Sequence, residues 1–359
     1  MNSRFTLSNG FTISARRIYA VRMKIGVVGP GAVGSYYGAK LWRDGHEVHF
    51  LMRSDYQIVR RRGVRIKSPE GGFVANPGLA QSPEKIGVCD LVIIALKTTA
   101  NHLFPKLLPP LVGPNTAVLT LQNGLGSEEK LAELFGPERI MGGLCFVCLN
   151  RVEPGVIEHI AHGKIVMGEF GGYPEPRTHD IATAFKHAGI PVSVAENLAC
   201  AHWEKLVWNI PFNGLGVASC SGLEAFFNLH EPKAPLQPRG PCLTTDLLLA
   251  DPGWSGLVRE LMLEIIAAAR FKKFHLEEGL ADEQIEKTRI MSAYKPSTLI
   301  DFERGQPLEL DSLFLEPLRQ ARAADIETPR LQRLCAVLRA LEETRERSAP
   351  PEIKQSAQP

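Results

Sequence analysis

The sequence predicts an α/β N-terminal domain, built on a doubly wound parallel sheet, followed by an all-helical C-terminal domain. Three observations predict this. The run KIGVVG at 24–29 is apolar enough for a strand buried on both faces, and it leads into a glycine-rich turn. Apolar runs then alternate with helical stretches up to about residue 195. Beyond that point helical periodicity continues with almost no strand-like run.

The chain has 359 residues, which corresponds to two domains at ~100–200 residues each. We expect a cofactor-binding domain over 23–195, a helical substrate and catalytic domain over 196–342, and a disordered tail over 343–359. Residues 1–22 contain four arginines and no acid. A disordered extension upstream of a start at Met23 explains that composition, as does an organelle-targeting peptide.

The elements follow from the pattern in order. In the first domain, strands are expected at 24–29, 47–53, 90–96, 117–123, 164–169 and 191–196, and helices at 32–44, 101–111 and 178–188. In the second domain, helices are expected at 199–218, 255–270, 280–292 and 310–341. Strands separated by helical crossovers favour a parallel sheet with helices on both faces.

Composition excludes several classes of protein. Lys+Arg is 41 and Asp+Glu is 39, a net charge of +2, without the clustered basic charge of a nucleic-acid or membrane-surface protein. The seven cysteines are an odd number, which favours a reducing, cytoplasmic compartment over a disulfide framework. Cys145 and Cys148 form a CxxC in a strand-like run, where they would point to opposite faces, so we expect core cysteines and no metal site.

A dinucleotide-binding signature follows the first strand. Gly29, Gly31 and Gly34 form a GxGxxG that opens a helix at Ala32 and Val33. The first glycine makes the tight turn, the second lets a pyrophosphate approach the backbone, and the third allows close packing of helix and strand. The helix N-terminus then favours the anion. The sheet is therefore expected to be of Rossmann type, although a purely structural glycine turn has the same pattern.

The end of the second strand favours NADP(H) over NAD(H). An NAD enzyme usually carries an acid at this place, which bonds the ribose 2′-hydroxyl. Here the strand ends FLMRS, with Arg53 at that position, and an arginine can bind the 2′-phosphate. Asp55 lies two residues further on, so some use of NADH stays open.

Two polar residues lie at strand ends, the edge at which open α/β sheets bind ligands. Lys97 closes DLVIIALK, and Asn123 closes AVLTLQN before Gly124. Each could instead only cap its strand, and for Asn123 a cap in the Asn-Gly turn is a serious competitor.

A polar stripe occurs on an otherwise apolar helix, AHWEKLVWNIPFNGL. Lys205, Asn209 and Asn213 are spaced by four residues and share one face. A helix that is apolar nearly all round is buried, and its polar groups then need partners or a ligand. The alternative is that the stripe faces water.

A third block reads KPSTLID from Lys295 to Asp301, followed by Glu309-Leu-Asp311. Taken alone it is typical of a loop and a helix start, with Ser297 as a cap. The order GxGxxG, strand-end Arg, LK, QNG, WEKLxxNxxxN and KPSxLxDxxxGxPxELD resembles the ketopantoate reductase (2-dehydropantoate 2-reductase) family over nearly the whole chain, from about residue 23 to about 341.

The resemblance implies a Rossmann domain, a helical domain and an active site between them, where 2-dehydropantoate is reduced to (R)-pantoate with NADPH in pantothenate and coenzyme A synthesis. Lys205 matches the family's catalytic lysine, the general acid for the ketone oxygen. Burial would lower its pKa toward the working range. Glu309 matches the family's active-site glutamate, which helps to hold substrate and lysine.

Further roles are implied by matched position. The substrate-binding positions are matched by Asn209, Asn213, Ser297 and Asn123. The cofactor positions are matched by Gly29, Gly31, Ala32, Val33, Gly34, Arg53, Lys97 and Asn123. The partner is then a small 2-oxo acid, and relatives are monomers or homodimers.

The sequence departs from the family pattern in two places. The stretch 223–253 is longer than usual by roughly 20 residues. After Glu309 the chain reads LDSLFLEPLRQ, where many members have Asn-Gly. Two other functions therefore stay open, a reductase of another 2-oxo acid or imine, and a non-catalytic NADP(H) sensor, although a sensor needs no proton donor.

Overall fold

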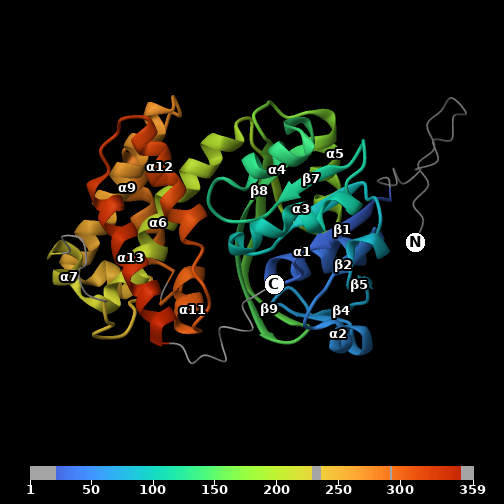
Figure 1. The fold of residues 1–359 in the computed structure, drawn as a ribbon, viewed down its shortest axis with the longest axis horizontal. Helices are drawn as coiled ribbons and strands as arrows, with labels where there is room; N and C mark the ends of the chain where they lie inside the picture. Colours follow the sequence, from blue (N-terminus) through green and yellow to red (C-terminus); the bar gives the residue numbers. More distant parts are fainter. Residues whose placement is uncertain (1–21, 229–235, 292, 349–359) are drawn as a thin grey trace, which may run out of the picture.

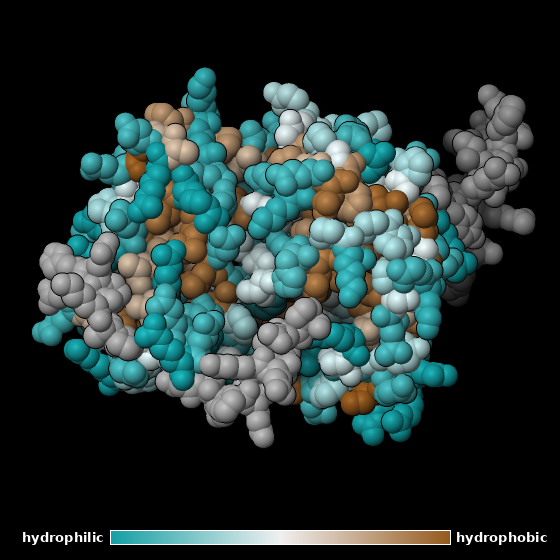
Figure 2. All heavy atoms as spheres, viewed as in Figure 1, coloured by the Kyte–Doolittle hydropathy of each residue, from teal (hydrophilic) through white to brown (hydrophobic). Residues whose placement is uncertain are grey.

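Ten strands form one sheet, and a bundle of helices lies beside it (Figure 1). The structure is a computed structural model that describes residues 22–228, 236–291 and 293–348. Figure 2 shows hydrophilic residues over much of the visible surface, with smaller hydrophobic patches among them on both halves of the molecule. The α/β and helical parts that the sequence predicts are therefore both present.

Six neighbouring strands of the sheet run parallel. In spatial order they are β5 (Gly78–Ala80), β2 (Glu47–Leu51), β1 (Lys24–Val28), β6 (Leu91–Ile94), β7 (Ala117–Thr120) and β8 (Ile140–Glu153). Numbered along the chain, this is the order 3-2-1-4-5-6 of dinucleotide-binding sheets. The central strands β6 and β7 are buried at every residue, as expected for apolar runs covered on both faces.

Beyond β8 the sheet becomes mixed, so the predicted doubly wound parallel sheet has an antiparallel extension. β8 turns into the long antiparallel strand β9 (Val156–Glu169). The other edge of β9 pairs in parallel with β3 (Val64–Lys67) near its start and with β10 (Val192–Val194) near its end. β4 (Phe73–Ala75) is antiparallel to β3. β8 begins with the apolar run IMGGLCFVCL, whereas β9 interrupts its apolar residues with Glu158, His159, His162 and Lys164.

Helices cover both faces of the sheet and build two apolar clusters. One cluster includes Tyr37 of α1 (Ala32–Arg43) and Phe185 of α5 (Pro176–His187). The other includes Leu131 of α4 (Ser127–Phe135). The helices α2 (Tyr56–Arg62) and α3 (Phe104–Leu107) complete this part.

The helix predicted over 101–111 is wrong in detail. This segment is a series of short turns, Thr98–Leu103 and Pro109–Leu111 on either side of α3. Prolines 105, 109 and 110 remove backbone N–H donors, so a regular helix cannot continue through them.

Helix α6 (Leu198–Ala218) is the centre of the helical part and is buried over most of its length. It packs most extensively against α9 (Pro252–Phe271). The remaining helices are α7 (Leu223–Asn228), α8 (Thr245–Ala250), α10 (Gly279–Arg289), α11 (Ser297–Glu303), α12 (Glu316–Ala323) and α13 (Pro329–Ser348). A π-helical turn over Asp311–Leu315 runs directly into α12, and residues 324–328 separate α12 from α13, so the helix expected over 310–341 is two pieces.

The structure locates two boundaries, the start of the helical part and the end of its last helix, that can be compared with the expected ones. The last strand ends at Val194, and α6 begins at Leu198, where the side chain of Asn197 accepts a hydrogen bond from the Cys200 N–H. At the other end, α13 continues past Glu342 to Ser348, so a disordered tail from 343 is wrong for these residues. The expected disorder of 1–21 and 349–359 lies outside the described residues.

Candidate active site

The glycine turn after β1 has the geometry that its sequence predicts. Gly29 has a φ of +86°, and a Cβ there would lie 2.5 Å from the Leu96 N. A Cβ on Gly34 would lie 2.6 Å from the Gly29 O, so helix α1 approaches the strand closely. A Cβ on Gly31 would meet only the Gly29 O, at 4.0 Å. The first N–H groups of α1, at Ala32 and Val33, therefore adjoin open space that suits a pyrophosphate.

Arg53 and Asp55 follow β2 and have different surroundings. Arg53 is exposed, and within the described part of the chain its guanidinium has no ion-pair partner. The Asp55 carboxylate is buried; it accepts a hydrogen bond from the Gly155 N–H at 3.3 Å and pairs with Arg151 at 3.4 Å. The Asp55 carboxylate therefore already interacts with residues at the β8–β9 turn, whereas the Arg53 guanidinium is available to a ligand.

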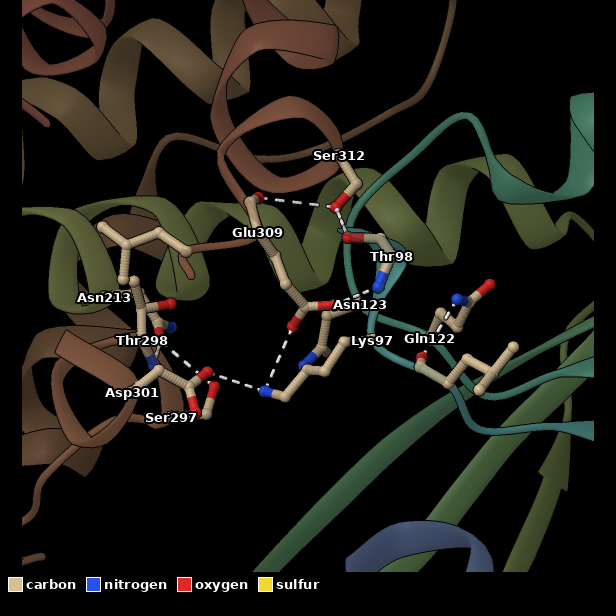
Figure 3. Close-up of polar contacts among 12 residues, drawn as sticks. Lys97, Thr98, Gln122, Asn123, Asn213, Ser297, Thr298, Asp301, Glu309 and Ser312 are labelled. Atoms are coloured by element: carbon tan, nitrogen blue, oxygen red, sulfur yellow. Dashed lines mark hydrogen bonds and ion pairs between the residues drawn. The ribbon is translucent and has the colours of Figure 1, made fainter. Parts of the chain in front are cut away.

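Lys97 reaches across the junction between the sheet and the helical part (Figure 3). Its Nζ donates to Asp301 Oδ2 at 2.7 Å and lies 3.4 Å from Glu309 Oε2. Burial alone would lower the pKa of Lys97, but Glu309 and Asp301 together raise it above its ordinary value. Glu309 is 8% exposed, and its other oxygen accepts a hydrogen bond from the Thr98 N–H at 2.7 Å.

Lys205 lies against the next strand-end loop. Its Nζ donates to Asn123 Oδ1 at 3.0 Å, and the ring of Phe146 on β8 is centred 5.4 Å from the same nitrogen. Burial lowers the pKa of Lys205 below its ordinary value, and Cys145 and Glu309 oppose that effect only in part. A lysine with this environment gives up its proton more readily than a free one.

Ser312, in the π-helical turn, joins the two strand-end loops. Its carbonyl accepts a hydrogen bond from the Leu125 N–H at 2.9 Å, and its hydroxyl bonds that of Thr98 at 2.8 Å. Gly124 has a φ of +87°, and a Cβ there would lie 2.3 Å from the Ser312 O. The glycine of the QNG sequence is therefore needed for the close approach, in addition to its backbone conformation.

The polar stripe of α6 continues away from Lys205 toward α11. Asn213 is 3% exposed, and its Oδ1 accepts hydrogen bonds from the Thr298 N–H at 3.1 Å and from the Ser297 hydroxyl at 3.4 Å (Figure 3). Asn209, one turn from Lys205, is 8% exposed, and its amide has no hydrogen bond to any described residue. An amide without a partner in the described chain is well suited to bind a polar ligand.

A second side-chain hydrogen bond joins α6 to the segment that contains the Asn123 loop and α4. His202 Nε2 lies 3.0 Å from Glu128 Oε1, and both residues are buried. His202 precedes Lys205 on α6, and Glu128 belongs to α4, which follows the Asn123 loop. A Cβ on Gly142 would lie 2.5 Å from the Glu128 oxygen, so β8 leaves just enough room for this pair.

The structure places the predicted cofactor and substrate residues near this edge of the sheet or on α6 and α11. Sequence reasoning missed Thr98, Ser312, Phe146 and the Glu128–His202 pair. Thr98 and Ser312 are far apart in the chain and carry no local motif. Asp301 could have been found, because it is the acid of the KPSTLID block.

The two cysteines of the CxxC have different surroundings, and only Cys145 packs against the core as expected. Cys145 packs against the core of the sheet, whereas Cys148 interacts with Tyr294 from the helical part, so the two lie on opposite faces. Among the described residues, no group of three or more His, Cys, Asp or Glu side chains could hold a metal ion. No helix in the described part of the chain combines the length and apolarity needed to cross a bilayer.

Comparisons with known proteins agree with this geometry. The model of the family described as ketopantoate reductase PanE/ApbA matches residues 25–172, and the model of its C-terminal part matches 241–342. The 2-dehydropantoate 2-reductase of Nostoc sp. is 38% identical over 325 residues, covering 89% of this chain and 95% of that protein.

Solved structures show the same relationship. The 2-dehydropantoate 2-reductase of Geobacter metallireducens is 41% identical with a TM-score of 0.78, covering 88% of this chain and 98% of that one. The enzyme of the same name from Methylococcus capsulatus is 32% identical with a TM-score of 0.79, covering 91% and 99%. The glycine turn, the Lys205–Asn123 contact and these matches lead to one conclusion: the chain belongs to the ketopantoate reductase family.

Proposed function

We propose that this chain reduces 2-dehydropantoate to (R)-pantoate with NADPH, using Lys205 as the general acid. The observation that carries the proposal is the position of Lys205, a lysine of lowered pKa held at 3.0 Å by Asn123 at the carboxyl edge of a dinucleotide-binding sheet. The names of the relatives supply the substrate. Residues 23–195 would hold the cofactor, and the following helical part would contribute the lysine.

The family and the strand order indicate a nicotinamide cofactor. The open space at Gly31 and the first N–H groups of α1 fit its pyrophosphate. When bound, the nicotinamide supplies the hydride for the ketone carbon. Arg53 supports the 2′-phosphate form, because its guanidinium is free to bind phosphate while the Asp55 carboxylate is occupied by Gly155 and Arg151.

Lys205 would hold a proton at Nζ and deliver it to the ketone oxygen as that oxygen gains negative charge. General acid catalysis of this kind typically contributes ~10²–10⁴ in rate. Asn123 accepts one N–H of the ammonium, which orients the others. After transfer, the neutral amine takes a new proton from water.

Glu309 would act beside Lys205 as its counter-charge and as an acceptor for a substrate hydroxyl. The Thr98 N–H and Lys97 hold its two oxygens in place. Lys97 would neutralise part of this negative charge and would lie on the nicotinamide side, in keeping with its match to a cofactor position of the family.

Asn209, Asn213 and Ser297 would bind the polar groups of the 2-oxo acid. The Asn213 Oδ1 is occupied by α11, which leaves its NH₂ group to donate. The Asn209 amide has both donors and its acceptor available. Neutral donors suit a substrate carboxylate without opposing the positive charge that Lys205 must keep before it acts.

The test is NADPH oxidation in the presence of 2-dehydropantoate, with NADH and a panel of other 2-oxo acids run alongside. We expect the highest kcat/KM for 2-dehydropantoate with NADPH. Absence of turnover with every 2-oxo acid, together with tight NADPH binding, would contradict the proposal and favour a sensor.

A reductase of a different 2-oxo acid is the second candidate. One observation favours it: Phe314 and Leu315 stand in the region after Glu309 where many members carry Asn-Gly, and Phe314 is fully buried. A changed segment next to Glu309 can change the substrate. The same panel separates the candidates, because this one predicts a higher kcat/KM for another 2-oxo acid.

A further inference from the structure

Strand β8 carries an exposed aromatic ring to the proposed general acid. Phe146 is 42% exposed, although its neighbours Leu144 and Val147 are buried or packed against the sheet core. The centre of its ring lies 5.4 Å from Lys205 Nζ, within the range of a cation–π contact. Exposure of an apolar ring to water is unfavourable, so a ring in this position beside the proposed general acid is suited to be covered by a ligand.

An irregularity in the hairpin lies directly beside the ring. Phe146 pairs with Lys164, but Val147 pairs with His162, so the register shifts between these two positions of β8. The skipped residue, Gly163, has a φ of +132°. Such bulges re-aim side chains and are frequent beside active sites.

We propose that Phe146 is a positioning and specificity-determining residue of this site. One face of its ring holds the Lys205 ammonium toward Asn123, and the exposed remainder contacts the alkyl group on the reacting carbonyl of a 2-oxo acid. The inference rests on the proposed function, because it assumes that Lys205 protonates a ketone oxygen.

The positioning role of Phe146 is supported by the charged and polar groups that face Lys205. Asn123 accepts a hydrogen bond from the ammonium, and the aromatic face attracts the same positive charge. The titratable groups around it are Cys145 on β8 and Glu309 before the π-helical turn, while His202 and Glu204 lie on its own helix. Burial raises the pKa of the Cys145 thiol to about 11, so this group stays neutral at ordinary pH.

Burial lowers the pKa of Lys205, whereas the ring, Asn123 and Glu309 favour its charged form. Removing the ring should therefore lower that pKa further. A contact of this kind corresponds to a shift of ~0.5 pKa units.

The specificity role of Phe146 is supported by the distance between its ring and Lys205 Nζ. A ketone oxygen bonded to Lys205 Nζ lies ~2.8 Å from it, and the first carbon of the alkyl group is two covalent bonds further on. When the oxygen binds on the side of the ammonium nearer the ring, that carbon comes within van der Waals reach of a ring centred 5.4 Å from the same nitrogen. The other substrate positions, Asn209, Asn213 and Ser297, are polar, so Phe146 supplies the apolar contact.

The experiment compares three full-length variants, Phe146→Leu, Phe146→Trp and Val152→Ala. Leucine keeps apolar bulk without an aromatic face, and tryptophan keeps the face. Val152 is the matched control, because it lies on the same strand and is also 42% exposed. Melting temperatures check that each variant is folded.

The first readout is the pH profile of kcat/KM, with the ¹³Cε shift of Lys205 as a direct titration that needs no turnover. Phe146→Leu should lower the lysine pKa by ~0.5 units, and Phe146→Trp and Val152→Ala should leave it within error of the parent. Equal lysine pKa values in all four proteins would overturn the positioning role.

The second readout is a series of 2-oxo acids with straight and branched alkyl groups. For this readout a further full-length variant, Phe146→Ala, removes the apolar contact altogether, and it should reduce kcat/KM for a branched substrate about tenfold relative to a straight one. An unchanged preference would overturn the specificity role. If the parent reduces none of these acids, the proposed function fails instead, and the Lys205 titration still decides whether the ring positions the ammonium.

Discussion

Asn123 Oδ1 accepts a hydrogen bond from Lys205 Nζ at 3.0 Å, which joins the loop after β7 to helix α6. The carboxyl edge of the dinucleotide-binding sheet and the helical part therefore meet at one amide–ammonium contact. Glu309 makes the corresponding connection from the helical part to the loop after β6, through Lys97 and Thr98. The proposed chemistry depends on both connections.

The first prediction concerns the pH dependence of catalysis. A general acid is active only while protonated, so kcat/KM should be constant at lower pH and fall tenfold per pH unit above the pKa of Lys205. Because burial lowers that pKa, the fall should begin below 10.5, the ordinary value for lysine. The control is Lys205→Arg. Its guanidinium stays charged, so any activity that it retains should not show this fall at high pH. A parent profile that stays flat through pH 10.5 would exclude Lys205 as the acid.

Gly124→Ala tests the approach of the QNG loop to the π-helical turn. The matched control is Gly222→Ala, since Gly222 has the same φ of +87° but no atom within 4 Å of an added Cβ. The control should lose only ~1–2 kcal/mol of stability, from backbone strain. Gly124→Ala should lose more stability than the control and should also have a lower kcat, because the new Cβ would lie 2.3 Å from the Ser312 carbonyl oxygen. Chemical denaturation measures both, and equal losses would contradict a steric requirement.

Arg53→Ala tests the choice of cofactor. We expect the KM for NADPH to rise about 10- to 100-fold, the loss of one charge-assisted hydrogen bond worth ~1.5–3 kcal/mol. The KM for NADH should change little. Arg60→Ala, a neighbouring exposed arginine on α2, serves as the control and should leave both values near those of the parent. Equal effects of Arg53→Ala on the two cofactors would argue against a phosphate contact.

The Glu128–His202 pair should stabilise the junction that carries Asn123 and Lys205. Glu128→Ala leaves a buried imidazole without its partner, and we expect a loss of ~1–3 kcal/mol in unfolding free energy together with a lower kcat. Glu128→Gln keeps an acceptor and should retain most of both. A double-mutant cycle with His202→Ala measures the coupling, and strictly additive losses would show that the contact contributes nothing.

Much of the fold could be predicted from the sequence, because its signals are local. The apolar runs of β1, β6 and β7 and the glycine turn between β1 and α1 each fit within a few residues. The stripe of Lys205, Asn209 and Asn213 likewise depends only on helical spacing. The family assignment is confirmed by the comparisons.

The rest could not be predicted, because it depends on contacts between distant residues. The bond between Thr98 and Glu309, and the approach of Gly124 to Ser312, join segments almost 200 residues apart or more. The exposed ring of Phe146 belongs to a hairpin whose strands pair with register shifts, and no local sequence signal predicts these shifts. The roles of the site residues, the cytoplasmic location and the monomer-or-homodimer state stay predictions.

The most direct test of the central claim is a single turnover of 2-dehydropantoate by Lys205→Ala preloaded with NADPH, compared with the parent and with Lys287→Ala, an exposed lysine on α10. We expect the reduction step to slow by ~10²–10⁴ in Lys205→Ala only, while its Kd for NADPH stays close to that of the parent. A reduction step as fast in Lys205→Ala as in the parent would contradict the account.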